Sequence, residues 1–234
     1  MKTEKKLAQE LIDSRNGEAP AQAPGETIQI KPLRMRTVVC AIRGVAPYMQ
    51  LRFSVKGKSD YMNKQKAGSQ SGSKKVREAK NFDELYKAAL YQPKKGGFGI
   101  PAAAFRAALI SACRIVGFKM TLAKLSVFVE ADDKDNLDGT PLVALHGEPQ
   151  KSEMVVRNAT GVIDVRIRPV WQEWTANPRI RFDEDLFSLG DVANLLARVG
   201  AQVGIGEGRP DSRSSAGLGF GLFEVTEIQE IRKK

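Results

Sequence analysis

The sequence predicts an α+β protein of the ferredoxin type, in which two β-α-β units share one antiparallel sheet. Segments of strand-like and helical pattern alternate along the 234 residues in the order strand, helix, strand, and this order occurs twice. Both helical segments carry an apolar stripe on one side. Two stretches, at about 47–95 and 132–162, interrupt the order, so we expect the first to be a basic insertion and the second a β-hairpin insertion.

The first unit is expected to begin with a strand over 33–44, because the second half of this segment is apolar on both faces, as in a central strand. A sharp turn at 96–101 places Pro101 at the first position of the following helix. A strand over 125–131 ends the unit. The helix is expected to bury one stripe, formed by Phe105, Leu109, Ala112, Cys113 and Val116.

The second unit is expected to begin with strands over 163–169 and 179–182, where apolar and charged residues alternate. A helix should start near 188–191 and stop at Gly200. The last strand is expected over 222–228. The apolar side of the helix is formed by Val192, Leu195, Leu196 and Val199.

Composition excludes several classes of protein. Hydrophobic residues make up 42% of the chain and charged residues 27%, which excludes a wholly disordered protein. No run approaches the roughly 18 apolar residues of a membrane span. Cys40 and Cys113 are the only cysteines, too few for a disulfide scaffold, so we expect buried free thiols. The sequence therefore predicts a soluble protein of a reducing cytoplasm. Positive charge alone does not separate a nucleic-acid partner from an acidic membrane surface, and we expect no membrane partner.

Positive charge is concentrated in the first insertion. The chain has a formal net charge of +10, and twelve basic against four acidic residues lie between Arg52 and Lys95. The middle of this stretch, 66–75, is rich in Gly and Ser and is expected to be a mobile loop. Such a loop suits contacts with phosphates, whose condensed counterions Lys and Arg displace. The alternative is a solvated insertion that only keeps the protein soluble.

The first 26 residues are expected to form a separate arm and linker, with the main domain over 27–234. Residues 4–15 have the pattern of a short helix with an apolar side, and 19–25 have that of an extended linker. An arm this short cannot fold alone. It is either disordered or docks on a neighbouring subunit.

The segment 200–221 contains seven glycines together with Arg209, Arg213 and Phe220. Glycines such as Gly206 and Gly208 allow close approach of the backbone to a ligand and expose N–H groups to anions. The arginines add positive charge, and the phenylalanine offers a face for stacking of a base. The alternative is a loop that simply turns tightly between a helix and an edge strand.

Motifs for catalysis or metal binding are lacking in the sequence. Gly57-Lys58-Ser59 is not preceded by the glycine that a phosphate-binding loop requires. The acidic stretch 133–139 does not fit a calcium-binding EF-hand. His146 is the only histidine and has no marked nucleophile beside it. We therefore expect a protein that is not an enzyme and has no catalytic residues, cofactor or metal.

Three ordered features resemble the RAMP superfamily, the RRM-like backbone subunits of CRISPR effector complexes. They are the first strand ending in Gly44-Val-Ala-Pro-Tyr48 before a basic insertion, the helix opening Gly99-Ile-Pro-Ala-Ala-Ala-Phe-Arg-Ala-Ala-Leu109, and the glycine-rich 209–221 before Leu222-Phe-Glu-Val225. Within this superfamily, 33–228 most closely resembles small Cas-seven-like proteins encoded in bacteriophage genomes.

The resemblance implies an RRM-like domain whose copies pack side by side along one strand of RNA or DNA, in a bacterial host cell. It implies a homo-oligomeric helical filament, with other CRISPR-like or phage proteins as possible partners. We expect stacking on Tyr48, Phe98 and Phe220, and close backbone approach at Gly206 and Gly208. Phosphate contacts are expected from Arg34, Arg36, Arg43, Arg52, Lys56, Lys58, Lys64, Lys66, Lys74, Lys75, Arg106, Arg114, Arg209 and Arg213.

Three other functions remain open from the sequence. The first is a phage recombination protein that coats or anneals single-stranded DNA. The second is a metal-dependent nuclease that uses acids of the insertion, although Asp60 and Asp83 lack the context of a cleavage site. The third is a structural or inhibitory phage protein whose basic surface binds an acidic host protein.

Overall fold

The computed structural model describes residues 31–53, 55–67, 81–157, 161–212 and 217–231. The chain divides into two compact units, Met1–Leu33 and Arg34–Lys234. The expected helix at 4–15, the linker at 19–25 and the domain boundary at 26 lie outside the described residues. The description below concerns the second unit.

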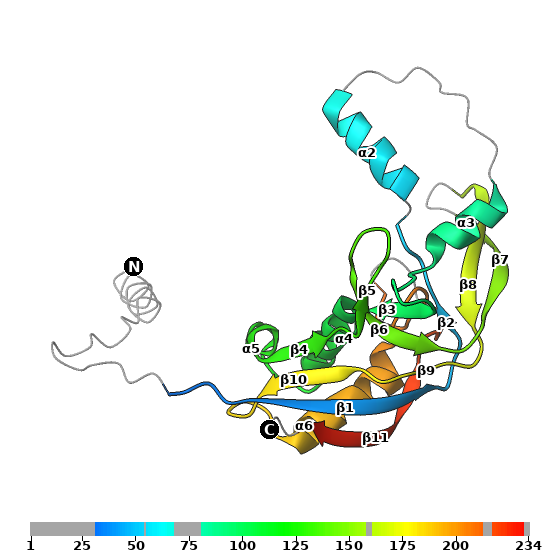
Figure 1. The fold of residues 1–234 in the computed structure, drawn as a ribbon. Coiled ribbons are helices and arrows are strands. Elements are labelled where there is room, and N and C mark those ends of the chain that lie inside the picture. The colour runs from blue at the N-terminus through cyan, green and yellow to red at the C-terminus, as the bar shows by residue number, and fades with distance from the viewer. Residues whose placement is uncertain (1–30, 54, 68–80, 158–160, 213–216, 232–234) are drawn as a thin grey trace, which may run out of the picture. The chain divides into compact units, whose positions relative to one another are not determined.

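Four antiparallel strands and two helices form the core of this unit (Figure 1). Along the chain they are β1 (Met35–Gly44), α4 (Ala102–Ile115), β4 (Val127–Glu130), β10 (Arg179–Asp183), α6 (Leu189–Arg198) and β11 (Phe223–Ile231). In the sheet, β1 pairs with β11 on one side and β10 on the other, and β10 pairs with β4. This β11-β1-β10-β4 order is that of a ferredoxin-like fold, so the predicted fold class is confirmed.

The core lies between the sheet and the two helices. Alternate residues of β1, Val38, Cys40 and Ile42, are at most 1% exposed and belong to the same cluster as Phe105 of α4 and Leu196 of α6. This alternation leaves the opposite face of β1 free of the helices. Cys40 is a buried free thiol, as expected, and so is Cys113. Burial raises the pKa of the Cys40 thiol to about 12.

A local signal explains where the second core helix starts. Ser188 and Asp191 form a reciprocal capping box at the start of α6. The predicted stop at Gly200 is wrong, because the chain continues as a π-helix over Val199–Val203. Gly200 is needed there for packing, since a Cβ atom would lie 2.1 Å from the Phe223 carbonyl oxygen.

Further strands extend this sheet and build a second one. Strands β9 (Thr175–Ala176), β6 (Pro141–His146), β3 (Phe98–Pro101) and β5 (Asp133–Lys134) extend the main sheet. Strands β2 (Tyr48–Met49), β8 (Ile163–Trp171) and β7 (Pro149–Arg157) form a separate three-stranded sheet.

Two expectations about strands need correction. The strand expected at 163–169 as part of the core is β8, which forms a hairpin with β7, and β10 alone takes the third core position. Trp171 at the end of β8 explains this placement, because its fully buried ring packs against Tyr48 of the neighbouring strand β2. The turn expected at 96–101 is in part strand β3, and Pro101 is the N-cap of α4.

Three more helices complete the unit: α2 (Val55–Ala67), α3 (Phe82–Ala89) and α5 (Met120–Ser126). Helix α3 lies in the first insertion and is capped by the Asn81 side chain. Most of the expected mobile loop at 66–75 lies outside the described residues. Among the helices of the described segments, none is long and apolar enough to cross a membrane.

The base of the first insertion is held by a buried polar junction. Arg52 is 3% exposed, and its Nη2 lies 2.9 Å from Asp135 and 3.1 Å from Asp138. Gln50 is also buried; its amide donates to the Gly99 carbonyl at 2.8 Å and its oxygen accepts from the Tyr91 N–H at 2.8 Å. The junction therefore joins the start of the insertion to its end and to the β5–β6 loop.

We expect Arg52→Ala to destabilise the protein by about 3–5 kcal/mol, because it leaves the buried Asp135 carboxylate without its cation. Urea unfolding followed by circular dichroism measures this loss. Arg34→Ala is the matched control, because it breaks an exposed ion pair with Asp185. Equal midpoints for the two variants would contradict a structural role of Arg52.

We expect acid to remove the stabilisation contributed by Asp138. The Thr140 hydroxyl donates to this carboxylate and, with Arg52, lowers the pKa of Asp138 to about 2. The folded pKa lies below the unfolded value of about 4, so the contribution is present above pH 4 and is lost as the pH falls toward 2. In Thr140→Val, an NMR titration should place the pKa of Asp138 closer to 4; an unchanged pKa would contradict this account.

Candidate nucleic-acid interface

A groove of about 670 Å³ runs between α4 and the glycine-rich segment. Helix α4 contributes its first turn, through Pro101 and Ala104, and a row of small residues further along. The facing wall is the backbone around Gly206 and Arg209. Lys124 of α5 and Leu51, which precedes α2 in the chain, also line the groove. Two of the segments in the predicted binding site, the helix opening and the glycine-rich loop, therefore meet in one groove.

The glycines of this wall are required by the packing of the loop. Gly206 has φ of +82°, and a Cβ atom would lie 2.5 Å from the Met49 carbonyl oxygen and 2.6 Å from the Tyr48 ring. Gly208 has φ of +78° and packs against the Phe220 ring. The tight-turn interpretation of the glycines therefore holds for the free protein.

The same loop also presents unbonded N–H groups. The N–H of Glu207 is bonded to the Met49 carbonyl at 2.9 Å. Among the described residues, no acceptor bonds the N–H groups of Gly206, Gly208 and Arg209. Because Gly206 and Arg209 line the groove, it offers backbone donors of the kind that bind anions.

Charged side chains of both signs line the groove. The Arg114 guanidinium lies 2.8 Å from the Asp211 carboxylate, which also accepts a hydrogen bond from the Ser111 hydroxyl. These two contacts, the Ser111 hydrogen bond first, lower the pKa of Asp211. Glu207 is held by Arg168, which does not line the groove. Lys124 is exposed, and no carboxylate of the described residues is within ion-pair distance of it.

Arg209 is partly tied to its own loop. Its Nη1 donates to the Gly206 carbonyl oxygen at 3.0 Å. The guanidinium still has other N–H groups with no recorded acceptor among the described residues. Arg209 can therefore stiffen the loop and bind an anion at the same time.

Two predicted contacts are wrong because the side chains are buried. Arg52 is committed to Asp135 and Asp138, so it is not available to phosphate. Tyr48 is 2% exposed and lies between Trp171 and Trp174, with ring centroids 5.5 Å from each, so its ring is not free to stack on a base. Burial also raises the pKa of the Tyr48 hydroxyl.

Arg106 is half-buried and lies away from the groove, and its phosphate contact stays a prediction. Its Nε donates to the Val127 carbonyl at 3.0 Å, and its Nη2 donates to the Lys124 carbonyl. These bonds tie α4 to the end of α5. Arg106 does not line the groove, and its guanidinium serves as a support for Lys124.

Three other arginines lie away from the groove and are paired with acids. Arg34 pairs with Asp185, and Arg43 pairs with Glu224. Arg36 lies between two carboxylates, Glu184 at 3.3 Å and Glu230 at 2.7 Å. The structure does not bring these arginines together with the glycine-rich loop, and their phosphate contacts stay a prediction.

The remaining predicted residues are placed as follows. Phe98 is half-buried in a T-shaped pair with Trp171, and Phe220 is half-buried against Gly208. Lys58 and Lys66 are exposed on α2, whereas only the backbone of Lys56 and Lys64 is described. Lys74, Lys75 and Arg213 lie outside the described residues. Contacts of these side chains with nucleic acid stay predictions.

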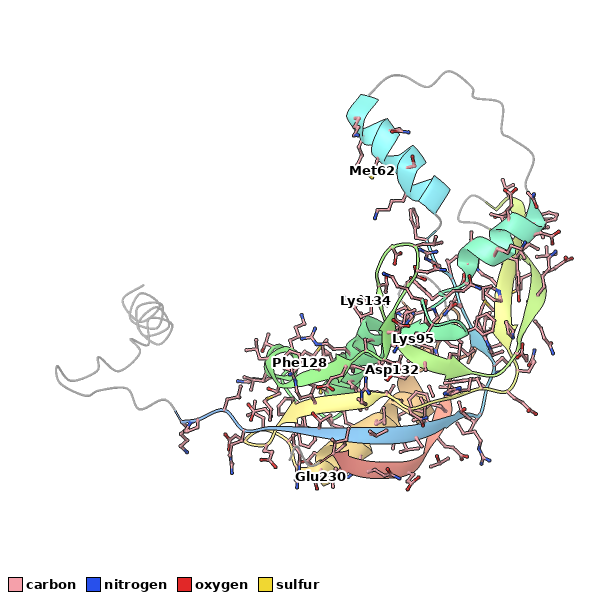
Figure 2. All side chains as sticks on the ribbon, viewed as in Figure 1. Met62, Lys95, Phe128, Asp132, Lys134 and Glu230 are labelled. Carbon is pink, nitrogen blue, oxygen red and sulfur yellow. The ribbon has the colours of Figure 1, made fainter. Side chains whose placement is uncertain are left out.

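The helix-free face of the core sheet is a poorer candidate site. RRM domains stack bases on aromatic residues of this face. Within the four fully described core strands, Phe128 of β4 is the only aromatic residue on this side, since Phe182 and Phe223 are buried (Figure 2). Guanidinium carbons of Arg106 and Arg181 lie 5.2 Å and 5.3 Å from its ring centroid. The Phe128 ring therefore already contacts two guanidinium groups, which compete with a base for stacking on it.

Sequence reasoning missed Ser111, Lys124 and Asp211. The spacing of Ser111 and Arg114 places both on one side of a helix and was a usable signal. Lys124 was missed because no sequence pattern indicated helix α5, and only a strand over 125–131 was expected there. Within the described segments, no three His, Cys, Asp or Glu side chains are close enough to hold a metal ion.

Comparison with solved structures finds chains of similar fold. No protein-family model matches the chain, and no curated protein matches it. A chain in the structure described as "Cryo-EM structure of the Type III-B Cmr-beta bound to cognate target RNA" is similar, with a TM-score of 0.45 and 12% identity. The match covers 99% of this chain and 66% of that chain. A TM-score below 0.5 carries no argument about function, and membership of the RAMP superfamily stays a prediction.

We expect Gly206→Ala to destabilise the protein clearly more than Gly219→Ala. Both glycines have positive φ, +82° and +72°, so both variants share a backbone cost of about 1–2 kcal/mol. Only Gly206 has Tyr48 and Met49 within 3 Å of the new Cβ, whereas nothing lies within 4 Å at Gly219. Thermal unfolding of the two variants measures the difference, and equal loss would show that the Gly206 contact is unimportant.

Proposed function

We propose that the groove binds the sugar–phosphate backbone of a single nucleic-acid strand, largely independently of base sequence. The observation that carries this proposal is the convergence of unbonded loop N–H groups, Arg209, Arg114 and Lys124 on one groove. The protein acts as a binding protein, and the proposal includes no chemical step.

The donors of the groove suit phosphate. Arg209 of the glycine-rich segment and Lys124 of α5 supply charge, and the loop N–H groups supply fixed donors. The first turn of α4 adds N–H groups that no side chain caps. A phosphate in the groove would thus meet both mobile and fixed donors, none of which reads a base.

The floor of the groove favours a single strand over a duplex. It is formed by small and apolar residues, among them Ala104, Ala107, Ala108 and Met120. These side chains suit the apolar surface of a ribose or an unpaired base, which a single strand exposes and a duplex covers. Contacts with phosphate on the rim and ribose on the floor make binding salt-sensitive and tolerant of sequence.

The basic insertion is directly connected to the groove. Gln50 and Leu51 line it, and α2, with four lysines, begins at Val55. In the proposal, these lysines add phosphate contacts beyond the groove and extend the bound length of strand. This accounts for the placement of most of the net charge in one insertion.

Self-association along the strand is the second part of the proposal. Among the described residues, β7 pairs only with β8, and β11 pairs only with β1, so both have a free edge. Val155, Val162 and Ile163 near the end of the β7–β8 hairpin are 72%, 59% and 58% exposed. Free edges and exposed apolar residues favour contact with another copy of the chain, which supports a side-by-side filament.

We expect Lys124→Ala to weaken binding of a fluorescent 20-nucleotide poly(U) strand about threefold to tenfold. It should also reduce the slope of log Kd against log salt by about 0.7, because one fewer counterion is released. Lys134→Ala removes the same charge from β5, outside the groove, and should leave binding near that of the wild type (Figure 2). Equal effects of both variants would contradict the proposed site.

We expect oligomers to grow with strand length. Sedimentation of the protein with poly(U) of 15, 30 and 60 nucleotides should show a rising number of bound copies. Val155→Lys, on the exposed side of the hairpin, should lower this cooperativity without lowering the affinity for the shortest strand. One copy bound on every length would overturn the filament and leave the binding groove in place.

A further inference from the structure

The Asp211 carboxylate lines the groove, although a carboxylate repels the anions that the groove is proposed to bind. Asp211 accepts from the Ser111 hydroxyl through Oδ2 and from Arg114 Nη2 through Oδ1 at 2.8 Å. All three residues line the groove. The Asp211 carboxylate thus accepts hydrogen bonds from a hydroxyl and a guanidinium. The same two donors can bind a phosphate oxygen.

We propose that Asp211 is a built-in competitor for phosphate, which occupies Ser111 and Arg114 in the free protein and gives them up to a bound strand. This inference rests on the proposed function and names the residue that sets the affinity of the same site. The carboxylate thus takes the place of one phosphate of the ligand.

The charge of the groove supports this role. Its charged lining residues are Arg114, Lys124, Arg209, Glu207 and Asp211. Glu207 is already balanced by Arg168 from outside the lining. Asp211 is therefore the carboxylate that reduces the positive charge available to a ligand. Its hydrogen bonds and neighbouring arginines lower its pKa, so it is ionised at neutral pH.

The ion pair is also open to exchange. The side chain of Arg114 is 61% exposed and that of Asp211 is 32% exposed, so solvent and ligand reach both. An exposed pair of this kind contributes little to stability, because water and salt screen it. Rotation of the Asp211 side chain is enough to free both donors, while its backbone N–H stays bonded to the Val203 carbonyl at 3.2 Å.

The position of the two donors fits the exchange. Ser111 and Arg114 are three residues apart on α4, so they lie on one side of the helix, and the Arg114 Nη2 is 3.4 Å from the Ser111 hydroxyl oxygen. Because they already converge on one oxyanion, a phosphate oxygen can replace the carboxylate without rearrangement of α4. Binding then leaves Asp211 uncompensated, which limits the affinity.

The test compares Asp211→Asn with the wild type in binding to fluorescent poly(U) 20-mer over a range of salt. We expect the variant to bind about fivefold more tightly. The salt slope should also steepen, because the Asp211 carboxylate that the wild type releases on binding takes up a cation and the variant has no such carboxylate. Asp211→Ala should show the same two changes, since neither effect depends on the new amide.

The matched control is Asp185→Asn, which removes an aspartate that pairs with Arg34 and does not line the groove. It should bind poly(U) less than twofold more tightly than the wild type, because its added charge lies outside the site. Ser111→Ala in the Asp211→Asn background should reverse part of the gain, since Ser111 then donates to phosphate. Thermal unfolding confirms that each variant is folded.

The outcomes separate this inference from the proposed function. If the wild type binds poly(U) and neither Asp211 variant binds more tightly, the competitor role is overturned and the groove stands. A gain in Asp185→Asn equal to that in Asp211→Asn also overturns the competitor role, because the effect is then one of net charge. If neither the wild type nor any variant binds, both proposals fail.

Discussion

The buried junction around Arg52 is the constraint on which the rest of the molecule depends. Arg52 places a guanidinium inside the protein beside Asp135, and the neighbouring Gln50 bonds to the backbone at Gly99 and Tyr91. An ion pair buried this deeply is costly unless additional hydrogen bonds satisfy its charged groups. Asp135 meets this condition by accepting from the N–H groups of Gln92, Leu137 and Asp138. The acidic loop therefore closes around an arginine of the chain itself.

This junction also determines the position of the groove. The same short segment supplies Gln50 and Leu51 to the groove lining, and Tyr91 lines it from the returning end of the insertion. Met49 then accepts the Glu207 N–H, and Tyr48 lies against Gly206. The glycine-rich wall is thus built on residues that the junction fixes. The fold accommodates a long basic insertion at this point because the junction holds the first and last residues of the insertion together.

The order of the core elements was predictable from the sequence, because periodicity reports which faces of strands and helices are buried. The strand at β8 was misplaced, since its alternation is the same in a core strand and in a hairpin of a second sheet. No local sequence pattern indicates that Arg52 and Tyr48 are buried, because their partners are distant in the chain. Arg52 pairs with Asp135. Tyr48 packs against Trp171 and Trp174. Charge alone suggested that an arginine next to a basic insertion binds phosphate. The helix opening and the glycine-rich loop could be picked out from the sequence because both contain unusual backbone residues; the structure places them on one groove, and their binding role stays a prediction.

The central claim is that a single strand lies in the groove between α4 and the glycine-rich loop. Photocrosslinking of the protein to 4-thiouridine-substituted poly(U), followed by mass spectrometry of the crosslinked peptides, tests it most directly. The account predicts crosslinks in peptides spanning 101–124 and 203–211, which line the groove. Crosslinks confined to β1, β4 and β10, with none in those two spans, would place the strand on the helix-free face of the sheet and contradict it.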